Sequence, residues 1–62
     1  MNLKELRERA GFSQNETSKL LNVSQAAVCL WEKGKTMPEA KKLEYMATLY
    51  KCSTDELLKA MR

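Results

Sequence analysis

The side chains best suited to bind a ligand are amides and amines, and five of them lie between residues 25 and 42. Gln25 is followed by four lysines within residues 33–42, where Glu39 is the sole acid, so this stretch alone has a charge of +3. A side-chain amide can form two hydrogen bonds to the edge of one nucleic-acid base, and ammonium groups neutralise phosphates. A solvated, lysine-rich loop would show the same charge pattern, so the charges alone leave both interpretations open.

The remaining reactive side chains argue against catalysis. The chain has 62 residues, no histidine and two cysteines, Cys29 and Cys52, whose separation does not suit a zinc site. Its eight carboxylates are dispersed, and it contains no glycine-rich loop that could hold a phosphate. So short a chain also cannot enclose a substrate pocket. The sequence therefore predicts a protein that is not an enzyme and that binds no metal, cofactor or small-molecule ligand.

Two helices joined by a tight turn must position the amide and amine groups. Ser13 and Glu16 form a capping box that predicts a helix over residues 14–21. Asn22 suits the left-handed exit of that helix, and Ser24 can cap a second helix over residues 25–33. Gly34 is a typical stop signal. Helix, short turn and helix together make a helix-turn-helix unit.

Three further helices are expected around this unit. Asn2 with Glu5, and Ser53 with Glu56, have the spacing of capping boxes, which predicts helices ending near Ala10 and near Met61. Pro38 precedes a fourth helix, expected over residues 39–50. The prediction is an all-α bundle of five short helices forming one domain over residues 1–62. Its apolar stripes comprise Leu3, Leu6, Ala10, Ala27, Val28, Trp31, Leu43, Met46, Ala47, Tyr50 and Leu57.

The helix over residues 25–33 has two different faces. Val28 and Trp31 fall on the side that must meet a core, whereas Gln25, Ala26 and Leu30 fall on the other side. A short helix in a small protein cannot bury both faces, and an α-helix fits the major groove of B-DNA. Double-stranded DNA is therefore the leading ligand. Because this face is rich in apolar side chains, a protein-interaction module of antitoxin or anti-repressor type on the same fold is the alternative.

The segments S-Q-N-E, N-V-S and W-E-K-G-K-T-M-P, in this order and spacing, resemble the lambda-repressor/Cro-like family of helix-turn-helix regulators. The similarity runs from Leu3 to Leu58. It implies sequence-specific binding of double-stranded DNA by a transcriptional regulator, with repression as the expected effect. Thr17 and Ser18 depart from the family pattern, which has a larger apolar residue and then alanine, and Thr17 is expected to weaken the core. Glu39 stands where the family has a Ser or Thr cap.

The resemblance also assigns roles to individual residues. The family's DNA-contacting positions correspond to Gln14, Gln25, Ala26, Leu30 and the loop over residues 33–36. An arginine at the position of Arg7 pairs in the family with the glutamate of W-E, here Glu32. With the residues that border the same face, the predicted DNA-binding set is Gln14, Ser24, Gln25, Ala26, Cys29, Leu30, Lys33, Lys35 and Thr36.

One such domain makes few phosphate contacts, so we expect a weak homodimer on a two-fold symmetric operator. The candidates for the dimer contact are Tyr45, Leu49, Leu58 and Met61, although Leu58 and Met61 could instead close the core. No apolar run is long enough to span a membrane, and the charged N-terminus does not resemble a signal peptide. With two unpaired cysteines, these features favour the cytoplasm.

Overall fold

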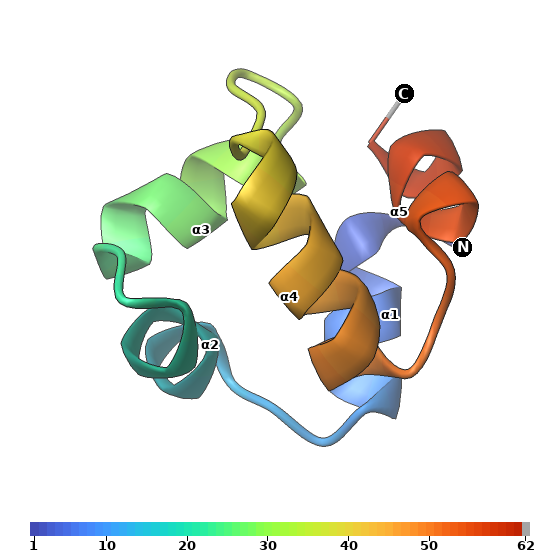
Figure 1. Ribbon diagram of the computed structural model, residues 1–62. Helices are drawn as coiled ribbons and strands as arrows, with labels where there is room; N and C mark the ends of the chain where they lie inside the picture. The colour runs from blue at the N-terminus through green and yellow to red at the C-terminus, as the bar shows by residue number, and fades with distance from the viewer. Residues whose placement is uncertain (62) are drawn as a thin grey trace.

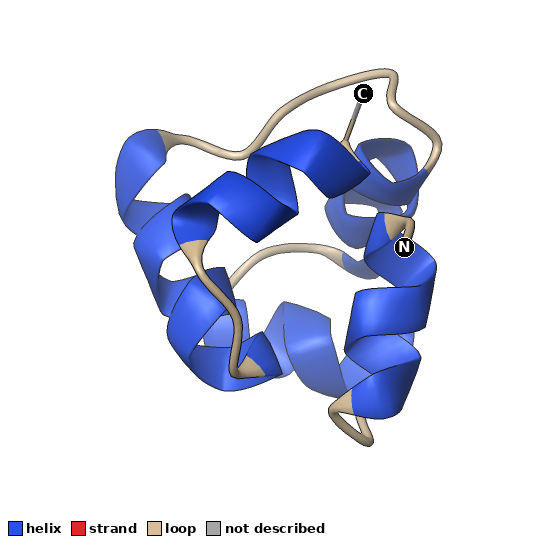
Figure 2. Cartoon of the chain, turned by 90° about the vertical axis from the view of Figure 1, so that its right-hand side faces the viewer, coloured by secondary structure: helices blue, strands red, loops and turns tan. Residues whose placement is uncertain are grey.

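Five α-helices make up the computed structural model, which describes residues 1–61 (Figure 1). Their bounds are α1 Leu3–Arg9, α2 Gln14–Leu21, α3 Gln25–Glu32, α4 Ala40–Tyr50 and α5 Thr54–Ala60. Only helices, turns and loops occur in these residues (Figure 2). The all-α fold and the five expected helices are confirmed, and each helix end agrees with the prediction to within about a residue. Arg62, the last residue of the expected domain, lies outside the described residues.

The helices begin where the sequence supplies caps. Capping boxes are present at Asn2, Ser13 and Ser53, each with the glutamate three residues further on. The hydroxyl of Ser24 accepts a hydrogen bond from the backbone N–H of Ala27 at the start of α3. At α4 the cap position is Glu39, whose side chain makes no capping hydrogen bond. The departure from the family pattern thus leaves α4 with the weakest start.

The turns include two residues other than glycine in the left-handed region, Asn22 and Lys51, and two glycines with positive φ, Gly11 and Gly34. Asn22 ends α2 with φ 57° and ψ 48°, as its type predicts. Lys51 ends α4 with nearly the same angles, an exit that its residue type gives no reason to expect. Gly34 has φ 76°, which only glycine adopts without strain, and it closes the exit of α3.

The core lies between α4 and the other helices. It contains side chains from all five: Leu3, Leu6, Leu21, Val28, Trp31, Met46, Ala47, Tyr50 and Leu57. Ala10, Ala27 and Leu43 were also expected there, and all three are only partly buried against the cluster. In Figure 1, α4 crosses the middle of the molecule, with α2 and α3 on one side of it and α1 and α5 on the other.

Thr17 and Ser18 are buried, yet both hydroxyls are satisfied. Thr17 Oγ1 accepts a hydrogen bond from the phenol of Tyr50, at 3.5 Å, and Ser18 Oγ donates to the carbonyl of Asn15 at 2.7 Å. A buried polar atom is costly mainly when it has no partner. The weakening of the core by Thr17 stays a prediction, and the structure adds that the Thr17 hydroxyl is hydrogen-bonded to the buried Tyr50. None of the described helices has the length and apolarity needed to cross a membrane.

Candidate nucleic-acid interface

The outer face of α3 is open to solvent. Val28 and Trp31 are buried, whereas Gln25 and Ala26 are exposed and Leu30 retains 38% of its accessible surface. This division matches the 3.6-residue period of the helix, because the exposed residues lie opposite the buried ones. Cys29, between the two sets, is partly buried. The α3 helix therefore presents an amide and several small or apolar groups on an accessible ridge.

An ion pair fixes α3 to α1. Arg7 Nε donates to Glu32 Oε2 at 2.6 Å, and both side chains are more than nine-tenths buried. Arg7 Nη1 also donates to the carbonyl of Phe12 at 2.7 Å, in the loop before α2. The hydrogen bond to Glu32 raises the pKa of Arg7 above its ordinary value, so the fold favours the charged guanidinium.

Gln14 is held by the same carboxylate. Its Nε2 donates to Glu32 Oε1 at 3.0 Å, while Glu32 Oε2 accepts from Arg7. One N–H of the Gln14 amide is therefore engaged within the protein and the second remains available. The backbone N–H groups of Gln14 and Asn15, in the first turn of α2, have no acceptor within residues 1–61. Such a helix start attracts anions.

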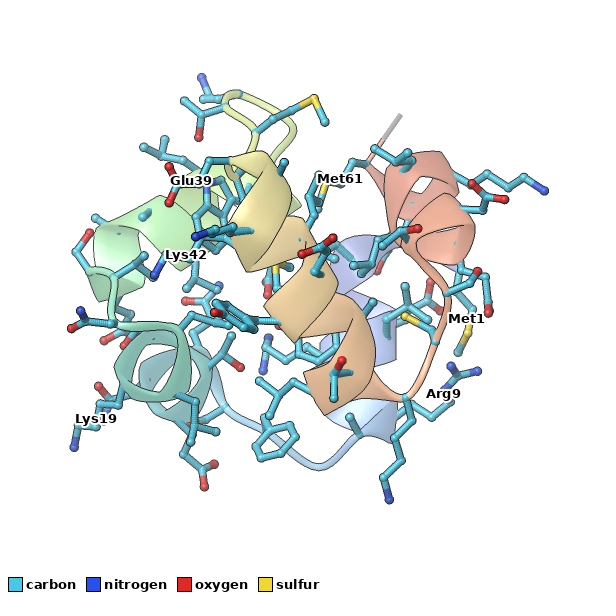
Figure 3. The ribbon with its side chains drawn as sticks, in the orientation of Figure 1. Met1, Arg9, Lys19, Glu39, Lys42 and Met61 are labelled. Atoms are coloured by element: carbon cyan, nitrogen blue, oxygen red, sulfur yellow. The ribbon has the colours of Figure 1, made fainter. Side chains whose placement is uncertain are left out.

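Most of the lysines after α3 are accessible. Lys33, Lys35 and Lys41 are exposed, as is Thr36. Lys42 differs, because it is partly buried and its Nζ donates to the carbonyl of Leu21 at 2.6 Å. Figure 3 shows Lys42 extending from α4 toward the turn between α2 and α3. Lys42 is thus engaged within the protein at the end of α2, unlike the other three lysines of residues 33–42.

Comparison with known proteins identifies the arrangement of α2 and α3. A family model described as helix-turn-helix matches residues 3–57. The chain belongs to this helix-turn-helix family. Its fold is that of a lambda-repressor-like domain, and domains of this family are DNA-binding parts of transcription regulators.

The chain is also similar to a curated regulator. It is 36% identical over 56 residues to the HTH-type transcriptional regulator ImmR of Bacillus subtilis (strain 168). The aligned part is 90% of this chain and 44% of ImmR, so the chain spans less than half the length of that relative. No solved structure matches the chain significantly.

The four candidates for a dimer contact lie in two places on the helix-turn-helix domain. Tyr45 and Leu49 line an apolar groove between α2 and α4, together with Phe12 and Leu20. Leu58 and Met61 belong to α5 and its end, where Leu58 is 38% exposed and Met61 packs against the core. Figure 3 shows Met61 beside α4 and α5. The fold thus does not bring these four side chains together in one groove.

The structure adds two residues to those predicted near α3. Asn2 and Lys4 line a hollow that is also bounded by Gln14, Cys29, Glu32 and Lys33. Lys4 and Arg7 are three residues apart and so share one face of α1. Arg7 was expected to reach α3. The three-residue spacing therefore indicates that Lys4 also lies on the side of α1 that faces α3. Among residues 1–61, no group of three or more histidine, cysteine or acidic side chains could hold a metal ion.

Proposed function

We propose that this chain binds double-stranded DNA sequence-specifically and represses transcription. The observation that carries this proposal is the exposed ridge of α3, which the fold leaves uncovered although the opposite face of the same helix is buried. The ridge has the diameter of a single helix and fits a major groove. The relative ImmR is a transcriptional regulator, which agrees with this function. The chain acts by binding rather than by catalysis.

The contacts divide into two kinds. Gln25 can form two hydrogen bonds with adenine, and Ala26 and Leu30 can contact thymine methyl groups. Ser24, the partly buried Gln14 and Cys29, and the exposed Lys33, Lys35 and Thr36 lie nearer the sugar–phosphate backbone. Since the ridge offers one strong hydrogen-bonding side chain, part of the specificity comes from the shape and deformability of the DNA.

One domain makes few phosphate contacts and so binds DNA weakly. A homodimer on a two-fold symmetric operator doubles these contacts and raises the affinity. Half-sites one helical turn apart place the subunit centres about 34–36 Å from each other. The longest extent of the Cα trace is 23 Å, so side chains from two copies must bridge roughly 11–13 Å. A contact across such a gap is small. The dimer is therefore weak without DNA, and Tyr45, Leu49, Leu58 and Met61 remain the candidates for it.

Selection from a random pool of DNA duplexes tests the proposal. We expect enrichment of a two-fold symmetric sequence and submicromolar binding of the selected duplex. Gln25→Ala should lose discrimination at one base pair by about 1–3 kcal/mol, which is roughly 5- to 150-fold. Leu30→Glu should abolish binding, because it places a carboxylate against the duplex.

Thr54→Glu is the matched control, since Thr54 is exposed at the start of α5 and is neither on the ridge of α3 nor among the candidates for the dimer contact. It should bind the selected duplex as the unsubstituted chain does. Folded protein that enriches no sequence would contradict the proposal. That outcome would favour the alternative, a protein-interaction module that uses the apolar ridge of α3.

A further inference from the structure

We propose that Lys4 of α1 completes a seat for one backbone phosphate of the bound DNA. The seat is the hollow of about 270 Å³ between the starts of α1 and α2 and the last turn of α3. This inference depends on the proposed function, because its ligand is the phosphodiester of the duplex that α3 contacts. It assigns a role in binding to α1, a helix that is otherwise only a support for the helix-turn-helix unit.

The charges around the hollow favour an anion. Lys4, Lys33 and Glu32 are the charged residues that line it. Both carboxylate oxygens of Glu32 are engaged: Oε2 accepts from Arg7 at 2.6 Å, and Oε1 accepts from Gln14 at 3.0 Å. Because the buried Arg7 balances the charge of Glu32, the two lysines give the hollow a net charge of about +2.

Lys4 has no other role in the described structure. It is exposed, and it takes part in no ion pair or side-chain hydrogen bond within residues 1–61. The neighbouring lysine of the hollow, Lys33, is likewise exposed and without an ion pair there. The ammonium groups of Lys4, on α1, and Lys33, at the end of α3, are therefore both free to contact an anion in the hollow.

The third wall of the hollow supplies neutral donors. Gln14 keeps one side-chain N–H that is not engaged with Glu32, and the first backbone N–H groups of α2 lack acceptors within residues 1–61. Gln14 lines the hollow from α2, Lys4 lines it from α1, and Lys33 lines it from the end of α3. A tetrahedral phosphate with several acceptor oxygens suits such a set of donors. Gln25 and Leu30 precede Lys33 in α3. A duplex whose phosphate binds in the hollow can therefore also contact both of these residues.

Salt dependence of binding tests the role of Lys4. With Lys4→Gln, affinity should fall several-fold and by equal factors for the selected duplex and for a random duplex of equal length. The slope of log K against log salt concentration should become shallower by about 1 per subunit. The base preference of the variant should match that of the unsubstituted chain, because a phosphate contact carries no sequence information.

Lys59→Gln is the matched control, since Lys59 is an exposed lysine of α5 and does not line the hollow. It should keep the original slope. Equal thermal midpoints for all three proteins verify folding. An unchanged slope with Lys4→Gln would overturn the assignment of Lys4 while leaving DNA binding intact. Absence of binding by the unsubstituted chain to any duplex would overturn both the seat and the proposed function.

Discussion

Arg7 is the buried cation on which the interface depends. Its guanidinium contacts the carboxylate of Glu32 and the carbonyl of Phe12, so one side chain connects α1, the loop before α2, and α3. Burying a charge is costly unless it is paired and hydrogen-bonded, and here both conditions are met. The pair therefore specifies how α3 sits on the rest of the fold.

Removing Arg7 should unfold much of the protein. Arg7→Ala leaves the carboxylate of Glu32 buried without its partner, at a cost of about 3–5 kcal/mol. A domain of this size has stability of the same order. Urea unfolding followed by circular dichroism gives the measurement, with Arg9→Ala as the control because Arg9 is exposed on the same helix. Equal midpoints for the two variants would contradict the structural role of the pair.

The capping box of α2 should make stability depend on pH. Hydrogen bonds from the backbone N–H and the hydroxyl of Ser13 hold the pKa of Glu16 below its ordinary value of 4.5. A carboxyl whose pKa is lowered by folding stabilises the protein above its ordinary pKa, and this contribution is lost as the pH falls through the lowered value. Thermal midpoints of Glu16→Gln and the unsubstituted chain should therefore differ near pH 7 and converge as the pH falls below the ordinary pKa of 4.5 and through the lowered value. A difference that is constant over this range would refute the linkage.

At the scale of helices, capping and turn residues in the sequence were sufficient to predict where each helix begins and ends. Asn22 and the capping residues Ser13 and Ser53 act through their own backbone neighbours, so residue type and spacing predict them well. Lys42 could not be predicted in this way. Its partner, the carbonyl of Leu21, is 21 residues away, and only the packing of α4 on α2 brings the two together. Lys51 in the left-handed region is a similar case, since the chain enforces a conformation that its type disfavours.

Lys42 provides a test at the level of α2 and α4. Lys42→Met keeps the length of the side chain and removes the ammonium group from the last carbonyls of α2. We expect a loss of about 1–2 kcal/mol, because the group both donates a hydrogen bond and interacts with the helix dipole. Lys41→Met, at the exposed neighbouring position, should change the stability by less than about 0.5 kcal/mol. Chemical denaturation measures the free energy of unfolding of both variants. Equal losses of stability in the two variants would contradict the capping role of Lys42.

For the molecule as a whole, affinity should be governed by salt. Three to five phosphate contacts per subunit, doubled in a dimer, predict a slope of log K against log salt of about −5 to −9. Sedimentation without DNA should show monomers at micromolar concentration, and the selected duplex should bind two copies. Titration at several salt concentrations gives the slope. A slope near zero would contradict binding through the phosphates of the DNA backbone, even if the affinity were high.

The shared carboxylate of Glu32 has a consequence for the kinetics of docking. Because it ties Gln14 and Arg7 to α3 before any ligand arrives, the three helices that would meet DNA already hold one relative orientation. Such preorganisation lowers the entropy lost in the encounter. The free and bound backbones should therefore superimpose closely, and the association rate should show no conformational lag.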